Sequence, residues 1–206
     1  AHEVYQRSLQ LSADDIRLVN SWRDFTPNYN QPSHTLKLVT DIFAADQLNL
    51  EDASVLYAKL NMAMFDAIVA ASKAKFHYSL LRPITYIRNS MGYPAWNPTI
   101  IAPPLPSYVG FQGLQASAVT ILEKYFGTNY AVIDSTQHSF HGSWSYSSLN
   151  GWLQDVAKGA FDSGNEFRFN IDAGFAQGER RCSRGCWTGD TRSIVPARSR
   201  CSSMRC

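Results

Sequence analysis

The chain has 206 residues, of which 45% are hydrophobic and 17% are charged, so it is long and apolar enough to form one domain with a core. It contains no run of 18 or more uninterrupted apolar residues, and we therefore expect no membrane span. The net charge of +2 is unevenly distributed, because residues 180–206 hold seven Arg and one acid, whereas residues 1–179 hold twelve bases and sixteen acids.

The change in composition predicts a domain over residues 1–179 and a basic tail over residues 180–206. All four cysteines lie in the tail: Cys182, Cys186, Cys201 and Cys206. Their spacing is not typical of a zinc site, and no His follows them. We expect an irregular tail, and leave open one or two disulfides, which would slightly favour a secreted or periplasmic protein. The tail lacks interleaved aromatic residues, so we expect no nucleic-acid partner.

The first helices are predicted from capping residues. Ser12 followed by Asp15 is typical of an N-cap with an acid at the third helical position, and apolar residues follow at helical spacing. Ser33 is expected to cap a second helix. A third helix is predicted from Glu51 to about Tyr78.

The middle of this third helix, residues 62–71, is apolar nearly all round, which predicts a central, buried helix. Asp66 interrupts this apolar run. If buried, Asp66 must have a polar partner, and it could brace a cation such as Lys73 or Arg82.

The second half of the body also has a helical pattern. Pro83 suits the first position of a new helix, and Gly127 suits the end of another. We predict a proline-rich loop over 92–108, a helix over 110–126, a loop over 128–146, a helix capped by Ser148 and a last helix over 166–176. We find no internal repeat and no strong strand alternation. The sequence therefore predicts an all-α fold, a bundle of about six or seven helices.

Two cations mark the most informative part of the chain. Lys75 and Arg82 are seven residues apart, and a continuous helix would place them on one face. Arg offers a planar fork of donors and Lys a compact charge, and both suit phosphate-like anions. The pair therefore predicts an oxyanion site.

The order of these parts resembles the bacterial vanadium-dependent haloperoxidases and, more broadly, the type 2 phosphatidic acid phosphatases. The likeness covers roughly residues 12–178. It rests on Lys75-Phe-His-Tyr, on Arg82-Pro with the proline-rich loop after it, on the helix start at 106–112 and on the segment 173–178. The resemblance implies a helical bundle of the haloperoxidase and acid phosphatase type, with vanadate or phosphate as the small oxyanion.

In that family a Lys and an Arg hold the anion, and a Ser-Gly pair at a helix start adds donors, followed by a His that acts as acid or base. Lys75 and Arg82 match the cations. The Ser-Gly-His triplet falls on Gly110, Phe111 and Gln112. We expect Lys75, Arg82 and Gly110 to bind the oxyanion, but Gln112 cannot exchange protons near neutral pH.

The family's second motif is also substituted. Its Arg falls on Ala160, with Lys158 nearby, its vanadium-binding or nucleophilic His falls on Glu166, and the Asp that orients this His falls on Asn170. A Glu166 carboxylate would repel an anion at ~4 Å by about 4 kcal/mol at an effective dielectric constant of about 20, which largely offsets one of the two cations. No catalytic residue is therefore assigned.

Three other histidines could replace the missing imidazoles. A helix would place His77 roughly 160° away from the face of the two cations. His138 and His141 lie in the predicted loop and could approach the site. A metal site made of these two residues and Glu166 has no support from spacing, so we expect no metal.

Three functions remain open. The first is a degenerate haloperoxidase-like protein that keeps part of an oxyanion site and has lost haloperoxidase activity, with a binding or structural role. The second is an active vanadium-dependent haloperoxidase or acid phosphatase with a rearranged site. The third is an assembly protein that uses the bundle for packing. A homo-oligomer is compatible with each.

Overall fold

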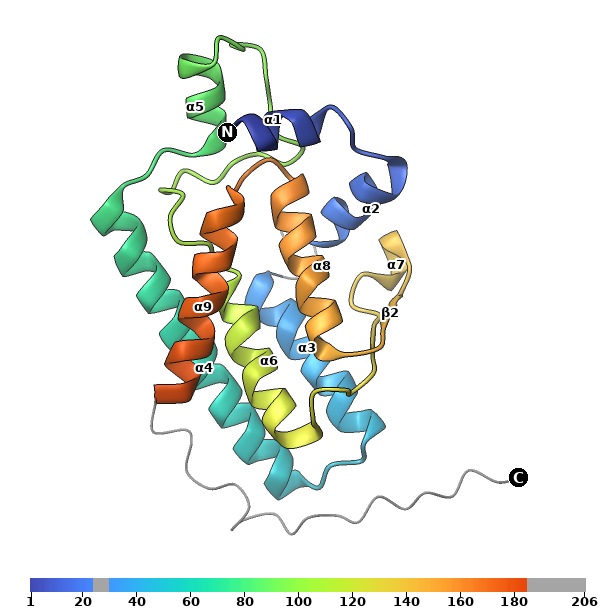
Figure 1. Ribbon diagram of the computed structural model, residues 1–206. Coiled ribbons are helices and arrows are strands. Elements are labelled where there is room, and N and C mark those ends of the chain that lie inside the picture. The colour runs from blue at the N-terminus through green and yellow to red at the C-terminus, as the bar shows by residue number, and fades with distance from the viewer. Residues whose placement is uncertain (24–29, 185–206) are drawn as a thin grey trace.

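The computed structural model describes residues 1–23 and 30–184, with side chains up to Arg180. Figure 1 shows helices that run side by side, which confirms the all-α prediction. The elements in chain order are α1 (His2–Ser8), α2 (Ala13–Ser21), α3 (Gln31–Ala45), α4 (Leu50–Tyr78), α5 (Pro83–Ser90), α6 (Gly113–Phe126), β1 (Val132–Asp134), α7 (His138–His141), β2 (Trp144–Tyr146), α8 (Leu149–Asp162) and α9 (Arg168–Arg184).

The centre of the bundle is α6, which packs against α3, α4, α8 and α9 (Figure 1). Every residue from Gly113 to Val119 is buried, including the polar Gln115 and Ser117. Leu114 and Leu122 join the main core, to which α3, α4 and α8 also contribute. Because residues on all sides of α6 are buried, this helix has the surroundings that the sequence predicted for α4.

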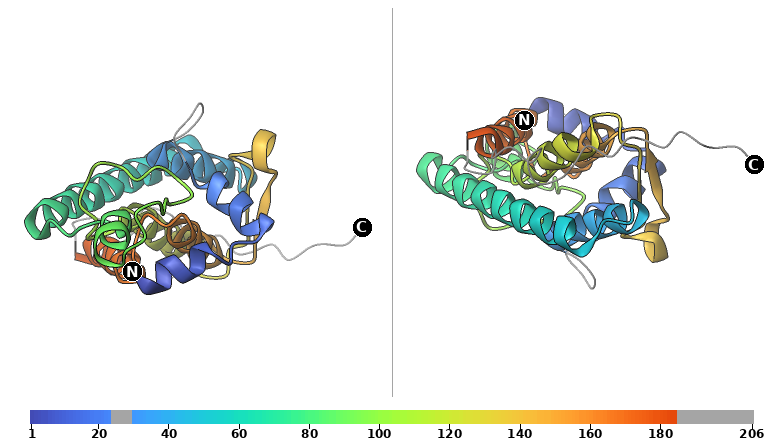
Figure 2. Two further views of the ribbon diagram at one scale, coloured as in Figure 1. Left: turned by 90° about the horizontal axis from the view of Figure 1, so that it is seen from above. Right: turned by 90° about the horizontal axis from the view of Figure 1, so that it is seen from below.

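The prediction that α4 is buried all round is wrong. Its inner face carries Leu56, Leu60 and Met64, which are at most 3% exposed, but Phe65 is 66% exposed. Asp66 is also exposed, so it does not brace a buried cation. Figure 2 shows α4 along one outer edge of the molecule in both views. By length and composition alone, the stretch Leu50–Ser90 could cross a membrane, a property it shares with core helices of many bundles.

Most predicted helix starts agree with the structure. Ser12 caps α2 in a capping box with Asp15, and Ser148 accepts a hydrogen bond from the N–H of Gly151 at the start of α8. The expectation that Ser33 caps α3 is wrong. Asn30 is the N-cap, and Ser33 is the third helical residue of the same capping box. Both side chains can cap, and the sequence does not distinguish the two registers.

The segment 128–146 was predicted to be a loop, but it contains two short antiparallel strands. Val132 of β1 pairs with Tyr146 of β2, and α7 lies in the connection. Each strand has three residues, which is too short for an alternating pattern to show in the sequence.

Close contacts of glycines fix α9 against the start of α6. A Cβ atom on Gly174 would lie 2.4 Å from the carbonyl oxygen of Gly110, and one on Gly178 would lie 2.0 Å from that of Gly113. The N–H of Gly110 also donates to the carbonyl of Asn170 at 2.8 Å. Only glycine allows two backbones to approach so closely. The contact brings residues 166–170 beside the segment 106–112, and this forms the site.

The last helix continues to Arg184, so it crosses the boundary expected after residue 179, and the first five residues of the expected tail are helical. The prediction of an irregular tail otherwise falls on residues 185–206, which lie outside the described part of the chain. The one or two disulfides left open for the four cysteines are not tested by the structure.

Candidate oxyanion site

Lys75 lies in the last turn of α4 and is completely buried. Its Nζ donates to the carbonyl oxygens of Pro106 at 3.1 Å and Ser107 at 3.0 Å, and lies 4.6 Å from the centre of the Phe111 ring. The pKa of Lys75 is lowered to about 8, mainly by burial; Glu166 acts in the opposite direction, and the charge of Arg82 adds a smaller lowering. The ammonium group thus holds the proline-rich loop against α4.

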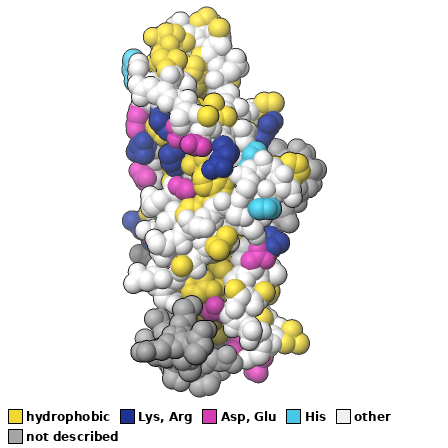
Figure 3. All heavy atoms as spheres, turned by 90° about the vertical axis from the view of Figure 1, so that its right-hand side faces the viewer, with side chains coloured by type: hydrophobic (Ala, Val, Ile, Leu, Met, Phe, Trp, Pro, Cys, Tyr) yellow, Lys and Arg dark blue, Asp and Glu magenta, His cyan; other side chains and the backbone are white. Residues whose placement is uncertain are grey.

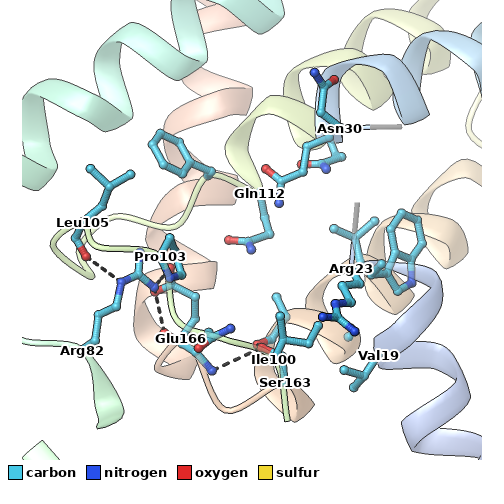
Figure 4. A pocket seen from close by; sticks show the side chains of 18 of the residues that line it. Val19, Arg23, Asn30, Arg82, Ile100, Pro103, Leu105, Gln112, Ser163 and Glu166 are labelled. Carbon is cyan, nitrogen blue, oxygen red and sulfur yellow. Dashed lines mark hydrogen bonds and ion pairs between the residues drawn. The ribbon is translucent and has the colours of Figure 1, made fainter. Parts of the chain in front are cut away.

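Arg82 is the N-cap residue of α5 and is 6% exposed. Its Nε donates to the carbonyl oxygen of Leu105 at 2.6 Å, and its Nη1 donates to the carbonyl of Asn165 and to Glu166 Oε1, both at 3.1 Å (Figure 4). The expectation that one continuous helix carries both cations is wrong, because α4 ends at Tyr78 and Ser79 has a left-handed backbone conformation. The two cations nevertheless converge.

The point of convergence is the carboxylate of Glu166, which is 6% exposed. Its Oε1 lies 3.1 Å from Arg82 Nη1 and 3.8 Å from Lys75 Nζ. Its Oε2 accepts hydrogen bonds from Ser107 Oγ at 3.0 Å and from Asn170 Nδ2 at 3.1 Å. The Glu166 carboxylate is therefore contacted by two cations, Lys75 and Arg82, and by two neutral hydrogen-bond donors.

Two members of this network act in ways that the sequence reasoning did not predict. Asn170 Nδ2 donates to Ser107 Oγ at 2.6 Å, and both residues are fully buried. Asn170 holds Glu166 rather than an imidazole. Ser107 was missed, and its only signal was its position in the segment before α6. The backbone N–H of Gly110, expected to face an anion, donates to Asn170 O instead.

A cavity of about 500 Å³ lies beside the ion pair. It is lined by five of the residues on which the family motifs fall, Arg82, Phe111, Gln112, Ala160 and Glu166. Arg23 and apolar side chains of α2, α8 and the proline-rich loop complete the wall. In Figure 4, Gln112 points into the cavity from the start of α6, and Arg82 and Glu166 lie at one side of it. Positions far apart in the sequence thus line one cavity, whereas Lys75 and Gly110 do not line it.

Several buried polar atoms at this cavity have no hydrogen-bond partner within the described part of the chain. They are Gln112 Oε1, Gln115 Oε1, Trp22 Nε1 and Asn165 Oδ1. Gln112 is 6% exposed and Gln115 is 1% exposed, so bulk solvent does not satisfy them. Buried polar atoms are normally satisfied, and these four are suited to a bound polar molecule or to ordered water.

The other candidate residues lie elsewhere. His77 is exposed and contacts Tyr78, and His138 Nδ1 lies 2.8 Å from Ser143 Oγ; neither they nor His141 line the cavity. The described residues contain no group of three or more His, Cys, Asp or Glu side chains arranged to hold a metal ion.

Lys158, which is two residues before Ala160 in the sequence, is also outside the cavity. It pairs with Asp15 and with Asp162, whose carboxylate also receives Arg7 Nε at 2.7 Å. Figure 3 shows side chains of both charges gathered on this face of the molecule. Hydrogen bonds from Lys158 and Ser12 lower the pKa of Asp15, and the network ties α1 and α2 to α8.

A second buried cluster was not predicted from the sequence. Asp134 accepts hydrogen bonds from Trp152 Nε1 at 2.8 Å and from the N–H of Thr136 at 3.0 Å, and it lies 2.9 Å from His34 Nε2. Burial would raise the pKa of Asp134, but its donors, His34 foremost, lower it to about 2. The ring of His34 stacks on Trp22. These contacts join α3, β1 and α8, which indicates a structural role.

The fold and the converging cations define a helical bundle of the vanadium haloperoxidase type. Residues 55–188 match the family described as the VCPO second helical-bundle domain, and the chain belongs to this family.

Three solved structures are similar to the chain. A bacterial vanadium-dependent iodoperoxidase has a TM-score of 0.82 and 22% identity, with 88% of this chain and 47% of that chain covered. The apo and holo types of a bacterial vanadium-dependent chloroperoxidase have TM-scores of 0.72 and 0.69, at 14% and 13% identity, with 88% of this chain and 46% and 45% of theirs covered. The chain thus spans about half the length of these proteins. No curated protein matches it.

Proposed function

We propose that this chain is a haloperoxidase-fold protein that does not oxidise halides, and that its own Glu166 carboxylate takes the place of the oxyanion. The observation that carries this proposal is the position of Glu166, within 3.1 Å of Arg82 and 3.8 Å of Lys75. An external oxyanion would have to displace this carboxylate or approach it closely. Either step carries a cost of several kcal/mol in a buried site.

The donors of the two cations support the same proposal. Lys75 donates two hydrogen bonds to backbone carbonyls, and Arg82 donates two more, to the carbonyls of Leu105 and Asn165. These bonds hold the proline-rich loop and the segment before α9. Donors that already face protein carbonyls are not directed at a ligand, so Lys75 and Arg82 have a structural role here in addition to any anion binding.

The residues do not fit vanadate. A vanadium centre of this family needs an imidazole ligand, and a carboxylate, Glu166, stands at that position. The position at which the family has its acid-base His holds Gln112, whose amide does not exchange protons near neutral pH. Ala160 faces the cavity with a methyl group where a further cation is expected. We therefore derive no reaction step through vanadate.

The cavity favours a binding role over a purely structural one. Its volume of about 500 Å³ is in the range of small-molecule sites, and its wall is mostly apolar with a few buried polar atoms. The four buried polar atoms at this cavity that lack a partner in the described part of the chain are suited to hold a polar ligand.

An activity assay tests this proposal. The purified chain is incubated with vanadate, hydrogen peroxide and bromide or iodide, and separately with a phosphate ester. We expect no turnover above background in either assay. Turnover that disappears in Arg82→Ala, but persists in the matched control Lys158→Ala, would show that the rearranged site is an active enzyme and would overturn the proposal. Circular dichroism of both variants checks that each is folded.

A further inference from the structure

The outer face of α4 carries an apolar stripe with coiled-coil spacing. The stripe, called the outer stripe below, alternates steps of three and four residues through Val55, Ala58, Met62, Phe65, Val69, Ser72 and Phe76. Phe65 and Phe76 are 66% and 65% exposed, and Val69 is 45% exposed. Such a 3.5-residue period is the seam by which two helices pack.

The outer stripe is separate from the face that α4 buries in its own bundle. The inner face is formed by Leu56, Leu60, Ala63, Met64, Ala67, Ala70, Ala71 and Lys75. The outer stripe extends over 22 residues, or about 33 Å of helix. A single exposed apolar residue is ordinary, but here Ala58, Met62, Phe65, Val69 and Phe76 are all exposed on one face, with Val55 and Ser72 half-buried among them. Such a row of exposed apolar residues marks an interaction surface.

A row of charged residues runs beside the outer stripe with strictly alternating sign. Asp52, Lys59, Asp66 and Lys73 are each seven residues apart, so they lie on one line along the helix. Residues spaced by seven cannot pair within one helix. Lys59, Asp66 and Lys73 form no ion pair with any other side chain in the described part of the chain.

We propose that the outer stripe pairs with the outer stripe of a second copy of this chain, in antiparallel orientation. In this dimer Met62 packs against Phe65 of the second copy. The numbers of two facing residues in an antiparallel pair have a constant sum along the helices, which is 127 for residues of the outer stripe. For the charged row beside the stripe the sum is 125. Lys59 meets Asp66 of the second copy, and Asp52 meets Lys73.

On the charged flank of this register both pairs join opposite charges, and the twofold axis makes each pair occur twice. The other flank sets Ser54 against Lys75 and Asn61 against Ile68, so it holds no like-charge pair. A parallel pair would instead set the charged row against Ser54, Asn61 and Ile68, none of which is charged. The alternation of sign thus favours the antiparallel arrangement and a partner identical to this chain.

Sedimentation velocity of the full chain, with a reductant to keep the tail cysteines apart, tests this inference. We expect a dimer whose dissociation constant rises at least about tenfold in Phe65→Glu and in Asp66→Lys, because the second change creates two like-charge contacts. The double variant Lys59→Asp with Asp66→Lys restores opposite charges and is expected to regain the wild-type affinity. All three changes are at the surface, so thermal melting of the monomer should not change.

Ile133→Glu is the matched control, because Ile133 is 61% exposed and lies on β1, away from α4. It should dimerise as the wild type does. The proposal is overturned if the chain is monomeric at all concentrations, if Phe65→Glu leaves the dimer unchanged, or if Asp66→Lys weakens it and the double variant does not recover. Flotation with phosphatidylcholine and phosphatidylglycerol vesicles adds one more outcome. Vesicle binding that Phe65→Glu abolishes, in a chain that stays monomeric, would assign the stripe to a membrane instead.

Discussion

Arg82 and Glu166 form a buried ion pair, with Arg82 Nη1 3.1 Å from Glu166 Oε1 and both residues 6% exposed. The pair joins the start of α5 to the segment before α9, 84 residues later in the chain. Under the function proposed above, Glu166 takes the place of an oxyanion, so this pair would connect the stability of the fold with anion binding.

The first prediction concerns the removal of one partner. Arg82→Met leaves Glu166 buried with less compensation and should lower the free energy of unfolding by about 3–5 kcal/mol. Arg168→Met is the control, because Arg168 pairs with Glu3 at the surface, with both side chains 58% exposed, and should change it by less than about 1 kcal/mol. Urea denaturation measures both. Equal effects of the two variants would contradict the buried-pair account.

The second prediction is that Lys75 loses its proton at a lower pH than an exposed lysine does. The pKa of Lys75 is about 8 in the folded chain and 10.5 in the unfolded chain. Between these values the unfolded state binds more protons, so the free energy of unfolding should rise with pH, by about 3 kcal/mol at most. In Lys75→Met this rise should be missing.

Carbon-13 NMR of lysine side chains checks the titration directly, with the Lys75 signal identified by its loss in Lys75→Met. A Lys75 signal that titrates with the exposed lysines, near its ordinary value of 10.5, would contradict the burial of this ammonium group.

The third prediction concerns the glycine contact between α6 and α9. A Cβ atom at residue 178 would lie 2.0 Å from a backbone oxygen, so Gly178→Ala must push the helices apart and should lower stability by about 2 kcal/mol or more. Gly151→Ala in α8 meets only an ordinary contact, at 3.4 Å, and should be neutral or stabilising. Thermal melting compares the two. Similar melting temperatures would show that the backbones are not in close contact.

The fourth prediction is a loss of stability in acid that depends on Asp134. Its pKa is lowered from 3.8 to about 2 in the folded chain, so its contribution is complete above about pH 4 and is lost as the pH falls towards 2. The contribution is about 2 kcal/mol. Asp134→Asn removes this pH dependence, so the difference between wild type and variant should shrink across the window. A constant difference from pH 2 to pH 6 would contradict it.

The sequence predicted much of the fold because its signals are local. Ser12, Pro83, Gly127 and Ser148 mark helix ends through contacts made within one turn. The error over α4 has a physical reason. Both faces of this helix are apolar, and periodicity alone cannot tell a face covered by its own bundle from one left exposed.

The site was predicted only in part for a similar reason. Lys75 and Arg82 were recognised by residue type and spacing, although the helix between them is broken. The role of Ser107 depends on contacts with residues 59 and 63 positions away, Glu166 and Asn170. Such contacts exist only once α9 lies against the start of α6, and no local pattern in the sequence encodes them.

The most direct test of the central claim is the binding of vanadate and inorganic phosphate to wild type and to Glu166→Gln by isothermal titration calorimetry. Glu166→Gln removes the internal carboxylate charge and leaves both cations, so its anion affinity should exceed that of the wild type by at least about tenfold. Added phosphate should also raise its melting temperature, and the exposed control Glu3→Gln should behave as the wild type does. If the wild type binds these anions as tightly as Glu166→Gln, the carboxylate does not occupy the oxyanion position and the account is wrong.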